Sequence, residues 1–305
     1  MNDKRLSIII PTIGRTVLDK TIESVLQQDV MPYEIVIWDN SGDGRAYEQS
    51  QYKDHPSLKW CISENKKDII NSWNSAVERS SGEYVYILGD DDLLLPGFTA
   101  QILQNLNRGA KLIHTPVQVI DPEDNIIDNE WGDIRQNKDI SEWEFLEHLH
   151  QADYRIMLGS LVFSRADYEQ VGRFKNIVMN GLYMDILFHL DLLFLHKKIT
   201  VLAAPVWQYR YGVSDWSGSL KSKEQELIFA EQCLSLYDYF KSVWYKEHKK
   251  IFGAFVHKIL IQEIVIKVYA HKRWKSLTLL FYKNFDFLER YRILKDLFYL
   301  ARHRK

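Results

Sequence analysis

Apolar runs and amphipathic stretches alternate along the first 115 residues, and this alternation constrains the fold more than any other feature of the chain. Runs rich in β-branched and aromatic residues predict buried strands, and apolar residues at helical spacing predict helices. The expected strands are 6–10, 34–38, 58–62 and 84–88, and the expected helices are about 16–28 and 68–79. Because such alternation winds helices around a mainly parallel sheet, the sequence predicts an α/β, Rossmann-like fold with helices on both faces of the sheet.

The last part of the chain has a different pattern. From about residue 221 the apolar spacing is helical to the end, and Lys, Arg and aromatic residues are mixed there. We therefore expect residues 1–220 to form the α/β domain and residues 221–305 to form a helical C-terminal region. This composition is typical of a helix at a membrane surface, although a helical cap on the sheet or a dimer surface would show the same pattern.

Features that would direct the chain into or across a membrane are not found in the sequence. It has no run of about 18 apolar residues and no signal-peptide core. The two cysteines, Cys61 and Cys233, lie far apart and have no metal or redox spacing. We predict a cytoplasmic protein with no nucleic-acid partner, and peripheral contact of the C-terminal helices with the inner face of a membrane is a further expectation.

Three consecutive aspartates follow the expected strand 84–88 after a single glycine, Gly89. Asp90, Asp91 and Asp92 would repel one another at the end of a buried strand, so folding alone gives no reason to gather them there. Carboxylate oxygens are the ligands that Mg²⁺ prefers, and open α/β sheets bind ligands at the carboxyl ends of their strands. We therefore predict a metal-diphosphate site; a helix N-cap with solvated loop acids is the structural alternative.

Two further aspartates are candidates for a functional role. Asp39 ends the second expected strand, where it could accept a hydrogen bond from a nucleotide base or ribose, or could simply start an Asx-turn. Asp185 lies in the first turn of a helix expected at about 182–195, and the helix dipole favours a carboxylate there whatever its function.

Two residues are candidates on the acceptor side. Gly159 interrupts the apolar segment 156–163, which predicts a strand that a ligand or another backbone approaches closely. Trp216 lies in the polar loop 213–219. Such a loop could be a sugar platform or a mobile lid, or a connector with a buried tryptophan.

Several motifs, taken together, resemble the family 2 glycosyltransferases of the GT-A fold, and the resemblance covers about residues 5–215. The segments that carry it are 7–15, 34–41, 82–84, 159–163, 172–174 and 209–210, with Asn74, the pair Met184-Asp185 and Ser214 between or after them. The resemblance implies an inverting enzyme that transfers a sugar from a nucleotide-diphosphate donor, with a UDP-sugar expected, to a hydroxyl of a saccharide or lipid-linked saccharide. It also implies a setting in bacterial surface polysaccharide synthesis.

The resemblance assigns roles to individual positions. Asp185 is the expected catalytic base, Asp91 and Asp92 are the expected ligands of Mg²⁺ or Mn²⁺, and Gly159 and Trp216 are the expected acceptor contacts. The residues expected to bind the nucleotide are Pro11, Thr12, Ile13, Arg15, Asp39, Asp68, Asn74 and Asp90. Within the catalytic domain, the nucleotide-binding half is expected at about 1–115 and the acceptor half at about 116–220.

The chain departs from the family pattern at three places, which leaves alternatives open. Gly89 stands at the first aspartate of the usual metal motif, Met184 stands at the usual glutamate before the base, and Gly212 lies near the place of a usual histidine. These departures favour a non-catalytic carbohydrate-binding or scaffold protein on a degenerate GT-A fold. A nucleotidyltransferase is a second alternative, but it would need a phosphate loop richer in glycine than residues 12–15.

Overall fold

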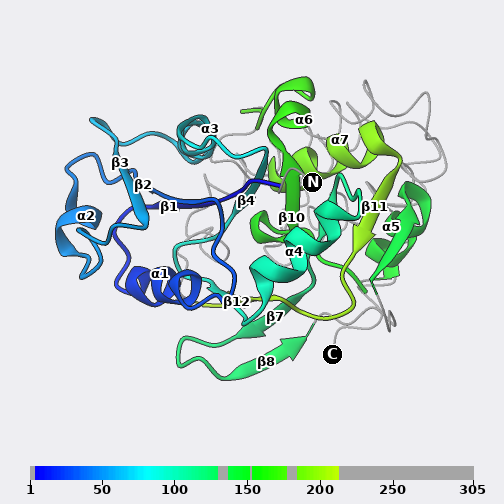
Figure 1. Ribbon diagram of the computed structural model, residues 1–305, viewed down its shortest axis with the longest axis horizontal. Coiled ribbons are helices and arrows are strands. Elements are labelled where there is room, and N and C mark those ends of the chain that lie inside the picture. Colours follow the sequence, from blue (N-terminus) through cyan, green and yellow to red (C-terminus); the bar gives the residue numbers. More distant parts are fainter. Residues whose placement is uncertain (1–3, 130–136, 152, 177–183, 213–305) are drawn as a thin grey trace, which may run out of the picture. The chain divides into compact units, whose positions relative to one another are not determined.

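The computed structural model describes residues 4–129, 137–151, 153–176 and 184–212 (Figure 1). The expected C-terminal helices, Trp216 and Cys233 lie outside the described residues, and so does the expected domain boundary near residue 220. No helix in the described part of the chain is long and apolar enough to cross a membrane.

The described residues contain a main sheet of eight strands in the order β3-β2-β1-β4-β10-β6-β11-β9. These strands are β1 (Leu6–Thr12), β2 (Glu34–Asp39), β3 (Leu58–Ile62), β4 (Tyr84–Ile87), β6 (Ile113–His114), β9 (Lys138–Ser141), β10 (Leu161–Ser164) and β11 (Lys198–Val201). The half formed by β3, β2, β1 and β4 is entirely parallel, whereas β10 runs antiparallel to both of its neighbours. The predicted α/β fold is therefore confirmed, with antiparallel strands added on one side.

Helices flank the main sheet, and α1 and α3 lie on opposite sides of strands β1 and β2 (Figure 1). The helices are α1 (Leu18–Leu26), α2 (Arg45–Gln49), α3 (Ile69–Arg79), α4 (Phe98–Asn107), α5 (Glu142–Gln151), α6 (Arg165–Gln170) and α7 (Met184–His196). Leu18, Ile22 and Val25 of α1 share one buried cluster with Ile8 and Ile10 of β1. The apolar residues whose spacing predicts these elements are thus the residues that form the core.

A smaller sheet of four strands also lies in the described region, in the order β5-β12-β7-β8. Its strands are β5 (Leu93–Leu94), β12 (Trp207–Arg210), β7 (Val117–Ile120) and β8 (Ile126–Asn129). Strand β12 runs parallel to β7 and antiparallel to β5, and this register sets Arg210 beside Ile120. The sheet therefore joins the end of the described chain to the segment that directly follows the three aspartates.

The apolar segment 156–163 differs from its prediction as one strand. Residues Leu158–Ser160 form a 3₁₀ turn, and the strand begins only at Leu161. A Cβ on Gly159 would lie 2.8 Å from the ring of Trp207, so the glycine is needed for close packing against an indole. The short helices α2 and α6 are also absent from the sequence prediction, because five or six residues give too little periodicity to detect.

Candidate active site

The three aspartates lie in a tight turn directly after β4. The backbone N–H of Asp92 donates to the carbonyl of Gly89 at 3.1 Å, which closes the turn. Asp90, Asp91 and Asp92 are all buried, with exposed fractions of 7%, 8% and 5%. The alternative of solvated loop acids is therefore wrong, and the carboxylates must be stabilised by protein groups or by a ligand.

Asp90 is held by the end of β1 and by the loop that follows it. The hydroxyl of Thr12 donates to Asp90 Oδ2 at 2.6 Å, and Arg15 Nε donates to Asp90 Oδ1 at 2.9 Å. Burial nevertheless raises the pKa of Asp90 to about 6, against the opposing charge of Arg15. Arg15 Nη1 also lies 3.8 Å from Asp91 Oδ2. The predicted nucleotide loop and the predicted acids thus meet, and the side chain of Ile13 in that loop is exposed.

The carboxylates of Asp91 and Asp92 both lie against Gly89. A Cβ on Gly89 would lie 2.6 Å from Asp92 Oδ2 and 3.2 Å from Asp91 Oδ1, so both carboxylates occupy space that any other side chain would need. Burial, and then the charge of Asp91, raises the pKa of Asp92 well above its ordinary value. Two carboxylates with raised pKa values around one small space are a fitting donor set for a divalent cation.

The protein supplies only part of a metal coordination sphere at this turn. Within the described ranges no group of three or more His, Cys, Asp or Glu side chains is arranged to hold a metal ion. Mg²⁺ is commonly bound by one or two carboxylates together with phosphate oxygens of a substrate. The geometry therefore fits a cation that arrives with a diphosphate better than a permanently bound structural metal.

Asp39 lies one strand away from Thr12 at the same edge of the sheet. The register pairs Thr12 with Asp39, and Pro11 with Trp38, across the parallel strands β1 and β2. Asp39 is fully buried, and its two oxygens accept the backbone N–H groups of Ser41 at 2.9 Å and Tyr47 at 3.1 Å. The Asx-turn is thus present, and contact with a nucleotide stays a prediction.

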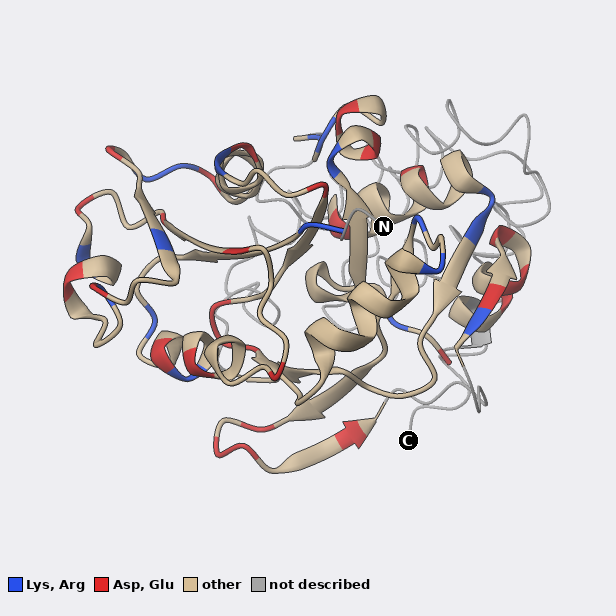
Figure 2. Cartoon of the chain, viewed as in Figure 1, with Lys and Arg blue, Asp and Glu red and all other residues tan. Residues whose placement is uncertain are grey.

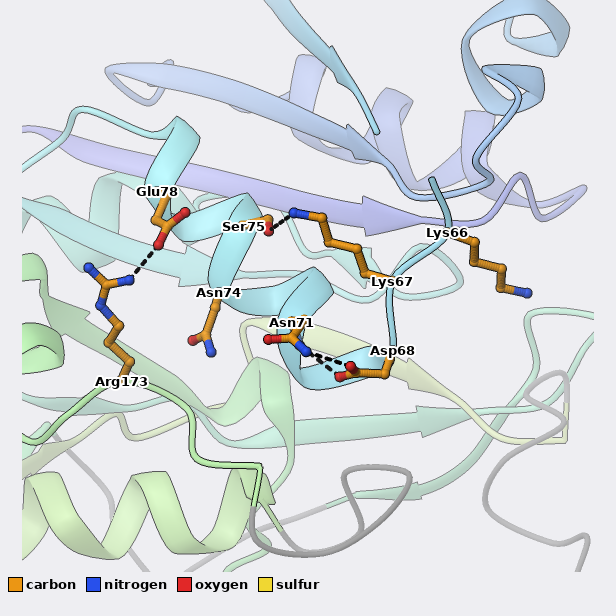
Figure 3. Close-up of a pocket in the computed structure, with 8 residues that line it drawn as sticks. All are labelled: Lys66, Lys67, Asp68, Asn71, Asn74, Ser75, Glu78 and Arg173. Carbon is orange, nitrogen blue, oxygen red and sulfur yellow. Dashed lines mark hydrogen bonds and ion pairs between the residues drawn. The ribbon is translucent and has the colours of Figure 1, made fainter. Parts of the chain in front are cut away.

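A polar pocket of about 570 Å³ lies along helix α3 (Figure 3). Its lining residues are Lys66, Lys67, Asp68, Asn71, Asn74, Ser75, Glu78 and Arg173. Asp68 caps α3 by accepting the backbone N–H of Asn71 at 3.0 Å, and this bond lowers the pKa of Asp68. The Asn74 amide donates to the carbonyl of Phe174 at 2.9 Å and accepts from the hydroxyl of Tyr168 at 2.8 Å. Both residues have structural partners, and their predicted nucleotide contacts are not tested by these bonds.

The remaining predicted residues lie on other elements. Asp185 is half-buried in the first turn of α7 and accepts the backbone N–H of Ile186 at 2.8 Å. Burial raises the pKa of Asp185 to about 6, which is suitable for a general base near neutral pH. Gly159 is buried, and its carbonyl accepts the hydroxyl of Thr115 at 2.8 Å. Their roles in catalysis and acceptor binding stay predictions.

Arg210 is a residue of the site to which the sequence analysis gave no role. It is fully buried at the end of β12, its backbone N–H donates to Asp92 Oδ1 at 3.0 Å, and its Nε donates to the carbonyl of Asp91 at 2.9 Å. An arginine is costly to bury without partners. The motif at residues 209–210 is the sequence signal that could have pointed to it.

The sequence of this chain is similar to known glycosyltransferase sequences. The family model "Glycosyl transferase family 2" matches residues 7–176, which is more than half of the chain. The GalNAc(5)-diNAcBac-PP-undecaprenol beta-1,3-glucosyltransferase of Campylobacter jejuni is 37% identical over 109 residues, which are 34% of this chain and 35% of that protein. The uncharacterized glycosyltransferase MJ1057 of Methanocaldococcus jannaschii is 24% identical over 177 residues, which are 56% of this chain and 61% of that protein. The matches thus span between about a third and three fifths of these curated relatives.

A solved structure shares the fold. Residues 1–349 of TarS from S. aureus, in complex with UDP-GlcNAc, superpose with a TM-score of 0.65. The alignment covers 91% of this chain and 80% of that one, at 14% sequence identity. At this identity the likeness concerns the fold, which agrees with the predicted GT-A architecture.

Proposed function

The chain belongs to glycosyl transferase family 2 and is an enzyme of the transferase class, and from this premise we propose that it moves a sugar from a UDP-sugar to a hydroxyl of a saccharide or lipid-linked saccharide. The observation that carries the proposal is the contact of Thr12 and Arg15 with the buried acids at the carboxyl ends of the strands, with Asp39 in register beside Thr12. Ligands of open α/β sheets bind at these strand ends.

The donor diphosphate would lie over Asp91 and Asp92. Asp91 Oδ1 and Asp92 Oδ2 are the oxygens that would hold Mg²⁺ or Mn²⁺, because both close over Gly89. The bound cation would neutralise the charge of the departing diphosphate. Arg15 holds Asp90 in place and keeps a guanidinium 3.8 Å from Asp91, so one positive charge would face the proposed diphosphate.

Asp185 is the proposed base for the acceptor hydroxyl. Its pKa of about 6 leaves it ionised at neutral pH while keeping it a stronger proton acceptor than an ordinary aspartate. It would remove the hydroxyl proton as the oxygen attacks the anomeric carbon, and the diphosphate would leave from the opposite face. One direct displacement inverts the anomeric centre, so an α-linked donor gives a β-linked product.

The names of the similar proteins support the choice of substrates. The Campylobacter relative is named as a beta-1,3-glucosyltransferase with a saccharide on an undecaprenol diphosphate, and TarS was solved with UDP-GlcNAc. We extend these substrate classes to this chain: a UDP-sugar donor and a saccharide carried on a lipid diphosphate, in bacterial surface polysaccharide synthesis. Basic and aromatic residues after position 220 would favour contact with the membrane that carries such an acceptor.

The proposal is tested by thermal stabilisation with a panel of nucleotide-sugars, each with Mg²⁺, Mn²⁺ or EDTA. A UDP-sugar should raise the melting temperature in the presence of the cation, because a ligand that binds only the folded state stabilises it. Incubation with an acceptor should then release UDP and form a β-linked product. Release of pyrophosphate would indicate the nucleotidyltransferase alternative, and no stabilisation by any nucleotide-sugar would contradict the proposed donor.

A further inference from the structure

The acidic turn is tied to a second, distant turn by the side chain of Arg210. Besides its two bonds to Asp91 and Asp92, Arg210 donates through Nη1 to the carbonyls of Asp121 and Pro122, each at 3.3 Å, and pairs with the carboxylate of Asp124. These three residues lie in the turn between β7 and β8, where acidic residues are close together in the chain (Figure 2). The buried guanidinium of Arg210 therefore contacts both turns.

The hairpin side of this connection is well fixed. Asp124 has a left-handed backbone with φ of 71°, an unfavourable conformation for most residues but one that Asp and Asn tolerate. Its second oxygen accepts a bond from Lys20 of α1 at 2.6 Å. The Asp121 carboxylate receives the backbone N–H groups of Glu123 at 3.0 Å and Asn125 at 2.8 Å, which holds the turn in shape.

The direction of the Arg210 guanidinium decides what the carboxylates of Asp91 and Asp92 can do. While Asp124 and the two carbonyls bind Nη1, the guanidinium contacts Asp91 through that residue's backbone carbonyl. The charge of Arg210 acts on the carboxylates of both Asp91 and Asp92, so without Asp124 the buried guanidinium would be drawn toward the acidic turn. A guanidinium that forms a forked pair with a carboxylate would compete with a cation for the same oxygens.

We propose that Arg210 is a positioning residue that fixes the Asp91–Asp92 turn, and that Asp124 sets Arg210 in the orientation that leaves both carboxylates available to a ligand. The β7–β8 hairpin is then part of the donor site without touching the donor. This inference rests on the proposed function for the identity of the ligand, and on the contacts of Arg210 alone for the coupling between the two turns.

The matched variants for the test are Asp124→Asn and Asp128→Asn. Both remove one negative charge from the same hairpin, but Asp128 pairs with Arg155 and is absent from the contacts of Arg210. Asparagine tolerates the left-handed conformation at position 124, so that variant should keep its backbone. Lys20→Met, which removes the second partner of Asp124, is a milder variant should Asp124→Asn fold poorly.

Hydrogen–deuterium exchange of the unliganded proteins tests the coupling. The amide of Arg210, which donates to the Asp92 carboxylate, and the amide of Asp92, which closes the acidic turn, should both exchange about tenfold faster in Asp124→Asn, as expected for loss of one hydrogen bond between charged groups. Lys20→Met should show a smaller increase at the same amides, and Asp128→Asn none. Equal exchange at these amides in Asp124→Asn and Asp128→Asn would overturn the inference.

Calorimetric titration with UDP and MnCl₂ tests the consequence for the donor site. The dissociation constant of UDP should rise about tenfold in Asp124→Asn and stay within about twofold of the wild-type value in Asp128→Asn. A role in stability alone would lower the melting temperature without this difference in binding, and that result would also overturn the inference. If wild-type protein binds no UDP, the proposed donor is wrong, and the exchange measurement still decides whether the two turns are coupled.

Discussion

Replacing Gly89 with alanine should damage the donor site far more than the fold. The added Cβ would lie 2.6 Å from Asp92 Oδ2, which is well inside van der Waals contact, so the carboxylate would have to move by about 0.5 Å or more. Asp92 Oδ1 accepts the N–H of Arg210 at 3.0 Å, and a movement of that size breaks this bond. The methyl group would also fill the space between Asp91 and Asp92.

The two consequences have different magnitudes. Loss of a buried hydrogen bond to a charged group lowers the free energy of unfolding by about 1.5–3 kcal/mol. The reduced conformational freedom of the unfolded chain raises it again by about 0.4–1 kcal/mol. The net loss of about 1–2 kcal/mol lowers the melting temperature by only a few degrees. Binding of UDP with Mn²⁺ should weaken by about tenfold or more, because the cation would lose the oxygens that face each other over Gly89.

Thermal unfolding and calorimetric titration of the same samples separate these two effects. Gly109→Ala is the control, because its added Cβ meets nothing within 4 Å while its φ of 98° strains any other residue. That variant should lose stability and keep the wild-type affinity for UDP and Mn²⁺. Unchanged affinity in Gly89→Ala would refute the reasoning, since the carboxylates could then not be the ligands of the cation.

Three further predictions concern other elements. Asp185→Asn should abolish sugar transfer but leave the affinity for UDP nearly intact, and an active variant would reject Asp185 as the base. The activity of the wild-type protein should fall as the pH drops below about 6, where Asp185 becomes protonated. Burial lowers the pKa of His189, so below pH 6.5 the unfolded state binds a proton that the folded state does not. In urea unfolding, the free energy of unfolding should therefore fall with decreasing pH by up to about 1.4 kcal/mol per pH unit. His189→Leu should reduce this slope. Asn74→Ala removes the bonds to Tyr168 and Phe174 and should cost about 2–4 kcal/mol in urea unfolding; unchanged UDP affinity in that variant would show that its role is structural.

The sequence predicted the elements of the main sheet and the residues at one of its edges because local patterns determine both. Strand composition and helical spacing are properties of short segments, so β1, β2, β3 and β4 were found within a residue or two. Asp39 ends β2 and Asp90 lies in the turn after β4, and parallel strands bring their carboxyl ends together. Thr12 and Arg15 could be placed for the same reason, because Thr12 ends β1 and Arg15 lies in the loop that follows.

The small sheet was beyond prediction because its pairings join segments distant in sequence. Strand β12 pairs with β7 although about 90 residues separate them, and neither strand carries a signal for its partner. The role of Arg210 depends on backbone carbonyls at Asp91, Asp121 and Pro122, and a carbonyl has no side-chain identity that a sequence pattern could detect. Gly159 was expected to face a ligand or backbone, and it faces Trp207 of β12, whose pairing with β5 and β7 the sequence does not reveal.

The two sheets share the task of holding the acidic turn. Asp90 is bound from the main sheet, through Thr12 and Arg15, whereas Asp92 is bound from the small sheet, through Arg210. The carboxylates therefore reach their positions only when both sheets are correctly aligned, since each sheet fixes a different end of a turn three residues long. This division explains why buried carboxylates with raised pKa values are tolerated here: the two sheets hold them together before any ligand arrives, and a cation with its diphosphate would then relieve their repulsion.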